Sequence, residues 1–130
     1  MSRDPGLYLA DIVEACKRIE RIASGRSDQD LVTDEIVRDA LLYSIVVIGE
    51  AASRIPSEVQ ARFPTIAWAR IKGMRNVLAH EYFGIDQGLV LDAVRNKVPE
   101  LRRAIEVALA SRLERRRVTP ALGRVAPPTA

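Results

Sequence analysis

The sequence predicts an all-α fold, a bundle of four main helices with short helical turns between them. Hydrophobic residues make up 48% of the chain and aromatic residues only 5%, so Ile, Val, Leu and Ala must build most of the core. Apolar residues recur at three- and four-residue spacing, which is typical of helices that bury one face. No stretch alternates apolar and polar side chains as a strand does.

The first helix is predicted from about Leu7 to Ala23, where an apolar stripe faces a charged one. Asp4 or Pro5 can begin it, and the Ser-Gly pair after Ala23 can end it. Residues 26–33 are polar and predict a loop or a single helical turn.

The second long helix is predicted from about Asp34 to Ile55, with Pro56 as its stop. Residues 41–48 are apolar on nearly every side, and such a helix is expected to be buried on every side. In a domain this small, that indicates either a central helix or one that also contacts a second subunit. Glu50 stands alone among small residues that allow close helix packing.

The rest of the chain also predicts helices. Residues 57–60 have the form of a capping box, which predicts a short helix to about Arg62, and a further helix is expected over 66–82. The last long helical segment covers 87–116 and should kink or restart at Pro99. Residues 118–130 are rich in proline and have no apolar period, which predicts a flexible tail.

The totals limit the class of protein. The 130 residues suggest one helical domain over 1–117 followed by the tail. Twenty basic against 17 acidic side chains give a mild preference for anionic partners. One cysteine, Cys16, and one histidine, His80, exclude an intrachain disulfide and the common zinc sites, so no metal or cofactor is expected. The chain has neither a signal peptide at its start nor a run long enough to span a membrane, so a cytoplasmic location is expected.

The candidate site lies in residues 73–85, around the single histidine. On a helix, Asn76 and His80 lie one turn apart on one face. Arg75 lies about 140° around the axis from His80, so the two flank a common groove. Tyr82 follows near the expected helix end.

These side chains suit RNA cleavage by the RNA's own 2′-hydroxyl. Imidazole transfers protons near neutral pH, and guanidinium binds phosphate and stabilises charge in a transition state. His80 would move the proton, Arg75 would hold the phosphate, and Asn76 would orient the ring or a phosphate oxygen, with no metal needed. Because one histidine cannot readily act as both acid and base, a symmetric homodimer would supply the second copy.

The same residue types have plainer roles. A lone histidine near a helix end is more often structural or exposed, and an arginine is more often in a surface ion pair. Glu50 should have a partner, Arg75 or His80, unless it faces water at the rim of the bundle, which is an equal alternative. Cys16 is expected in the core, and Trp68 is expected in the core or at an interface. The basic end of the last helix is more simply a solvated surface than a track for RNA: Arg102, Arg103, Arg112, Arg115, Arg116 and Arg117.

Residues 75–82, Arg-Asn-Val-Leu-Ala-His-Glu-Tyr, resemble the signature of the HepT-like toxins in the HEPN superfamily: Arg, four residues, His, one residue, Tyr. Further similar blocks lie at 7–12, 48–52, 71–76 and 82–86, so the resemblance covers about residues 7–110. It implies a helical bundle that forms a homodimer, with two motifs facing across a cleft.

The resemblance also implies an activity and a partner. The activity is that of a metal-independent endoribonuclease, the toxin of a toxin–antitoxin pair, with Arg75, Asn76 and His80 at its site. The implied partner is a minimal nucleotidyltransferase antitoxin that transfers AMP onto the motif tyrosine, here Tyr82. Added phosphate beside Arg75 would occupy the anion site and repel RNA.

Two other classes of function compete with a ribonuclease toxin. In a non-catalytic module, the same bundle would bind a nucleotide or the partner transferase, and the motif would be a binding or modification site. A helical DNA-binding regulator is favoured only by the mild positive charge, and no recognition helix follows a tight turn here.

Overall fold

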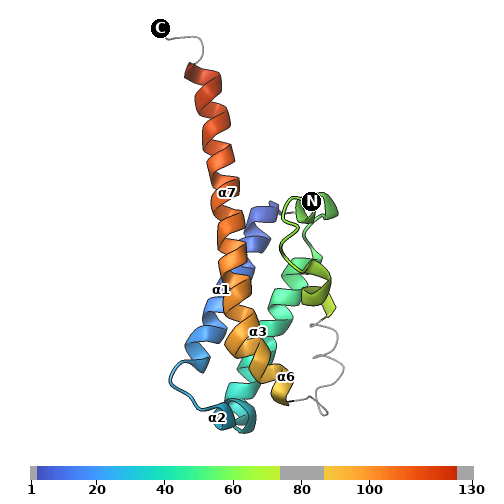
Figure 1. Cartoon of the computed structure of the whole chain (residues 1–130), viewed down its shortest axis with the longest axis vertical. Helices are drawn as coiled ribbons and strands as arrows, with labels where there is room; N and C mark the ends of the chain where they lie inside the picture. Colours follow the sequence, from blue (N-terminus) through green and yellow to red (C-terminus); the bar gives the residue numbers. More distant parts are fainter. Residues whose placement is uncertain (1–2, 74–86, 126–130) are drawn as a thin grey trace.

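The computed structural model describes the backbone of residues 3–73 and 87–125, and the side chains of residues 3–73 and 87–111. All regular structure in these ranges is helical, as predicted (Figure 1). Its elements, besides a helical stretch over residues 68–73, are α1 (Pro5–Ala23), α2 (Asp28–Thr33), α3 (Glu35–Ser53), α4 (Ser57–Gln60), α6 (Gln87–Asp92), the π-helical turn η2 (Ala93–Lys97) and α7 (Val98–Val125).

Side chains just before each helix fix where the first three begin. Asp4 Oδ1 accepts a hydrogen bond from Gly6 N at 2.7 Å, and proline fits the first turn of α1 because its missing N–H is not needed there. Ser27 Oγ accepts from Asp30 N, and Asp34 Oδ1 accepts from the first turn of α3. The stretch predicted as a loop or turn is therefore the short helix α2.

The core lies where α1 packs against both α3 and α7. Cys16 and Trp68 are buried, as predicted. The largest fully buried side chains come from these helices and their neighbours: Leu9, Ile12, Ile19, Leu31, Leu41, Ile45, Ile48, Val94, Val98 and Ile105. Since α1 is the helix that both long neighbours share, it holds the central position.

The sequence predicted that α3 is either a central helix or one that also contacts a second subunit. Among the described residues α3 is not covered on every side, and contact with a second subunit remains a prediction. α3 has an outward face on which Ile36 is 82% exposed and Tyr43 is 64% exposed. Its inward face, which includes Ile45, is fully buried against the core. The described part of the chain therefore leaves part of the apolar run of α3 exposed.

The interruption predicted at Pro99 takes the form of a wider helical turn. Proline has no N–H, and its ring would collide with the carbonyl group four residues earlier, that of Arg95. Just before it, the Val98 N–H donates to Ala93 O, five residues back, which is the π-helical pattern. The chain thus passes from α6 through η2 into α7 as one helical rod (Figure 1).

The predicted helix end near Arg116 is wrong, because α7 continues to Val125. Pro120 lies inside this helix, where it lacks the N–H that would bond the Arg116 carbonyl group, and the sequence pattern therefore did not predict that the helix continues through it. Figure 1 shows the end of α7 extending beyond the other helices. Residues 126–130 lie outside the described ranges, and the division into a domain of 1–117 and a tail of 118–130 remains a prediction.

Candidate functional site

The predicted site residues Arg75, Asn76, His80 and Tyr82 lie outside the described residues. The fourth main helix, expected over 66–82, is helical at 68–73, where the described chain stops. The structure describes the helix that leads into the motif, the end of α3 to which that helix is attached, and the helix that follows the motif.

The leading helix is tied to the end of α3 through a chain of hydrogen bonds. The Gln60 side-chain amide donates to Ile55 O at 3.0 Å and to Ala52 O at 3.3 Å, which satisfies carbonyl groups at the end of α3. The Trp68 indole N–H donates in turn to Gln60 O at 3.1 Å and to Phe63 O at 3.2 Å. Because Trp68 is also buried, it sets the position of helix 68–73 against α3.

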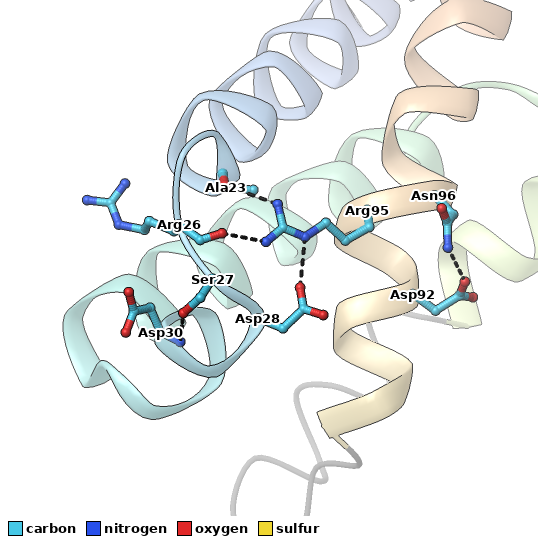
Figure 2. Close-up of polar contacts among 8 residues, drawn as sticks. All are labelled: Ala23, Arg26, Ser27, Asp28, Asp30, Asp92, Arg95 and Asn96. Atoms are coloured by element: carbon cyan, nitrogen blue, oxygen red, sulfur yellow. Dashed lines mark hydrogen bonds and ion pairs between the residues drawn. The ribbon is translucent and has the colours of Figure 1, made fainter.

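The following helix is fixed by Arg95, which lies on η2 (Figure 2). Its guanidinium reaches the loop between α1 and α2 with all three nitrogens: Nη2 donates to Arg26 O at 2.7 Å, Nη1 to Ala23 O at 3.1 Å, and Nε to Asp28 Oδ1 at 3.1 Å. We call this set of contacts the Arg95 clasp. It satisfies the last carbonyl group of α1 and holds the α6–α7 rod to the α1–α2 corner.

Glu50, the predicted supporting residue, lies near the end of α3 at the rim of the bundle. Its side chain is 45% exposed, and its carboxylate pairs with Arg54 one turn later at 3.3 Å. An exposed pair of this kind contributes little to stability. The predicted partners of Glu50, Arg75 and His80, lie outside the described residues, so their pairing with Glu50 remains a prediction.

The outward face of α3 leads to this rim. Ile36, Tyr43 and Glu50 recur at seven-residue spacing, so they lie along one side of the helix. Besides the apolar Ile36 and Tyr43, this side of α3 carries the exposed Asp39 between them, and it ends at the charged pair of Glu50 and Arg54. That charged end is the end of α3 to which Gln60 and Trp68 attach the leading helix.

The inner seam between α1 and α7 holds a second set of charges. Arg102 pairs with Glu20 of α1 at 2.6 Å and with Glu106 at 2.7 Å, and its hydrogen bond with Glu20 raises the pKa of the guanidinium. The sequence grouped Arg102 with a basic surface, but it belongs to this internal network. Burial raises the pKa of the neighbouring Cys16 thiol to about 12, so the thiol is neutral and poorly suited to act as a nucleophile.

Comparison with known proteins supplies the decisive observation. The sequence model of a family described as "Ribonuclease HepT-like" matches residues 12–108, which include the whole motif and both helices that frame it.

The chain belongs to the HepT-like ribonuclease family.

Relatives across the family carry names of the same kind. A protein named "Probable ribonuclease HepT" from Thermococcus cleftensis is 32% identical over 106 residues, which cover 82% of this chain and 96% of the relative. A "Putative RNase" from Caldanaerobacter subterraneus subsp. tengcongensis is 31% identical over 107 residues, again 82% of this chain and 96% of the relative.

A longer relative, "Gamma-glutamylcyclotransferase and putative RNase" from Methanocaldococcus jannaschii, is 32% identical over 105 residues. The match covers 81% of this HepT-like chain but 47% of that protein, so this chain spans about half of its length. No solved structure matches the chain. Within the described ranges, every helix is too short or too polar to cross a membrane.

The sequence missed the Arg95 clasp. Its acceptors lie 67 to 72 residues earlier in the chain, and two of them are backbone carbonyl groups, which leave no trace in the sequence. The one available signal was the arginine itself, placed four residues before Pro99.

Proposed function

We propose that this HepT-like protein is a metal-independent endoribonuclease and the toxin of a toxin–antitoxin pair. The observation that carries the proposal is the family match over residues 12–108, which contains the complete motif from Arg75 to Tyr82. The names of the relatives, each of which includes the word RNase or ribonuclease, support RNA as the substrate.

The proposed reaction uses the RNA as its own nucleophile. The His80 imidazole takes the proton of a 2′-hydroxyl, whose oxygen attacks the adjacent phosphorus while the bond to the 5′-oxygen of the next nucleotide breaks. The leaving oxygen takes a proton, and the products are a 2′,3′-cyclic phosphate and a 5′-hydroxyl. Arg75 binds the phosphate and stabilises the charge that builds up on it, and Asn76 orients the ring or a phosphate oxygen.

The second proton-transfer group comes from a second copy of the chain in this proposal. The outward face of α3 supports a homodimer, because Ile36 and Tyr43 leave large apolar surfaces in water when the chain is alone. Burying them against the same residues of a second copy would give a two-fold interface. The charged end of that face, at Glu50 and Arg54, would then lie towards the cleft between two motifs.

Neutralisation by the antitoxin acts at Tyr82 in the proposed system. A minimal nucleotidyltransferase would transfer AMP from ATP onto the phenol oxygen, with pyrophosphate as the leaving group. The added phosphodiester would bring negative charge and bulk beside Arg75, which competes with the phosphate of RNA for the same cation.

The test is RNA cleavage in the presence of a chelator, with the wild type and the His80→Ala variant purified side by side. Intact mass first establishes that Tyr82 is unmodified. We expect the wild type to leave cyclic phosphate ends and His80→Ala to lose at least about 100-fold in rate, the usual contribution of general acid–base catalysis. Arg75→Ala should lose activity as well, whereas Arg18→Ala, which removes an exposed cation from α1, should not.

Cleavage by His80→Ala at the wild-type rate would refute the assignment of this residue. If the unmodified wild type cleaves no RNA, yet binds nucleotide and is modified at Tyr82 by the transferase, the bundle is a binding module. Both outcomes are read from the same set of preparations.

A further inference from the structure

The positive charge of this protein is concentrated at one end of α7. Residues 112–125, which we call the arginine arm, contain five arginines and one glutamate. The remainder of the chain has 15 basic and 16 acidic side chains. The overall charge of +3 is therefore a property of the arm, and the rest of the protein is close to neutral.

Several cations outside the arm already serve the fold. Arg102 joins α7 to α1 through Glu20, the Arg95 clasp holds the α1–α2 corner, and Arg3 pairs with Asp11 at 2.8 Å. Each of these guanidinium groups forms an ion pair with a carboxylate that lies at least eight residues away in the chain. Within the arm itself, five arginines are accompanied by only one carboxylate, that of Glu114.

The arm also lies apart from the packed core. Ala108 is the last buried side chain among the described residues of α7. Figure 1 shows the helix continuing beyond α1 and α3 from there, with nothing of the described chain beside its end. At about 1.5 Å per residue, the arm is roughly 20 Å long, which is enough to follow several nucleotides of an extended strand.

The helical register gathers the arginines. Arg112, Arg115 and Arg116 are separated by three and four residues, the spacing that places positions on one side of a helix. All the cations of the arm are arginines, whose planar guanidinium binds phosphate with two hydrogen bonds. The cores of protein interfaces are poor in charged residues, so this composition favours a polyanion over a protein partner.

We infer that the arginine arm binds the phosphate backbone of the RNA substrate at a site separate from the catalytic motif. This inference rests on the proposed ribonuclease function and adds a second contact to it. A long RNA reaches both the motif and the arm, whereas a dinucleotide reaches the motif alone. The arm should therefore determine how tightly long RNA binds, and how strongly that binding depends on salt, without affecting the chemical step.

The test compares two full-length variants with equal loss of charge. In the arm variant, Arg112, Arg115, Arg116 and Arg117 become Gln, which keeps helix propensity. In the control, four exposed cations elsewhere become Gln: Lys17, Arg18, Arg21 and Lys97. Circular dichroism establishes that both are folded. The measurements are KM and kcat for a 30-nucleotide single strand and for a dinucleotide, over a range of salt concentrations.

We expect the arm variant to raise KM for the long RNA roughly tenfold or more, to lower the slope of log KM against log salt by about 2 to 3, and to leave kcat unchanged. Dinucleotide cleavage should be unchanged in both variants. A version with Lys at the four arm positions should recover most of the salt dependence. The control should resemble the wild type.

If the long RNA has the same KM in the arm variant, the control and the wild type, the inference about the arm is overturned. The proposed ribonuclease function would still stand in that case, because all three proteins cleave RNA. Loss of kcat on the dinucleotide would also overturn it, because the arm would then act through the catalytic motif. If the wild type cleaves neither substrate, the proposed function fails, and direct binding of the long RNA to the same variants still decides whether the arm holds RNA.

Discussion

Two helices of this protein pack in opposite ways. α1 packs against both α3 and α7, its Glu20 pairs with Arg102 across the seam, and its other side is charged and exposed. α3 buries one side equally well but turns Ile36 and Tyr43 towards water on the other. The comparison teaches that one chain suffices for the α1 seam, whereas the outward face of α3 has apolar surface left over. We associate the first region with folding and the second with assembly.

The largest expected difference is in the free energy of unfolding, when isoleucine is changed to alanine on the buried and on the exposed side of α3. Ile45 is fully buried, and Ile36 is 82% exposed. Ile45→Ala should lower the free energy of unfolding by about 2 to 5 kcal/mol, because it removes buried methyl groups and leaves a cavity. Ile36→Ala should change the stability of a dilute monomer by less than about 0.5 kcal/mol. Urea unfolding at low protein concentration measures both, and equal losses would mean that the outward face is packed within one chain.

The next largest effect concerns the Arg95 clasp. Arg95→Met keeps the length of the side chain but removes three hydrogen bonds, two of them to backbone carbonyl groups at the α1–α2 corner. We expect a loss of about 2 kcal/mol, the range for hydrogen bonds to a charged group. Lys97→Met, which alters an exposed cation on the same turn, is the matched control and should be nearly neutral. If both variants unfold at the same urea concentration, the clasp does not stabilise the fold.

A smaller effect concerns the stability of the protein at alkaline pH, which depends on Cys16 in the seam between α1 and α7. Burial raises the pKa of the Cys16 thiol from its ordinary value of 9.0 to about 12. The folded state therefore holds the thiol proton more firmly than the unfolded state does, and this contribution is complete below pH 9 and is lost as the pH rises towards 12. In Cys16→Ala, stability should fall less steeply between these pH values than in the wild type. Identical slopes in the two proteins would contradict the assignment of this thiol to the sealed side of α1.

Much of this architecture was predictable from the sequence because its signals are local. Asp4 and Asp34 cap their helices within the next few residues, and the apolar periods that define α1 and α3 need no distant partner. Pro99 forces a change in helical geometry within one turn, although the sequence did not tell a kink from a π-helical turn.

What the sequence did not predict depends on distant contacts. The Arg95 clasp joins residues far apart in the chain, and the internal role of Arg102 depends on Glu20, which is 82 residues away. The sequence left open whether α3 is central or contacts a second subunit, because an apolar run looks the same whether it faces the core or another molecule. The candidate motif around His80 was predicted from its residue types and from its resemblance to a family signature, and it lies outside the described residues.

The most direct experiment asks whether dimerisation through the outward face of α3 is required for RNA cleavage. Tyr43→Glu would place a charge in the proposed interface without altering a buried residue. The fraction of dimer, from analytical ultracentrifugation, and the rate of RNA cleavage are measured on the same samples over a range of protein concentrations. We predict that the rate follows the dimer fraction in the wild type, and that Tyr43→Glu is folded, monomeric and inactive. A monomer that cleaves RNA at the full wild-type rate would contradict the claim that α3 assembles the active site.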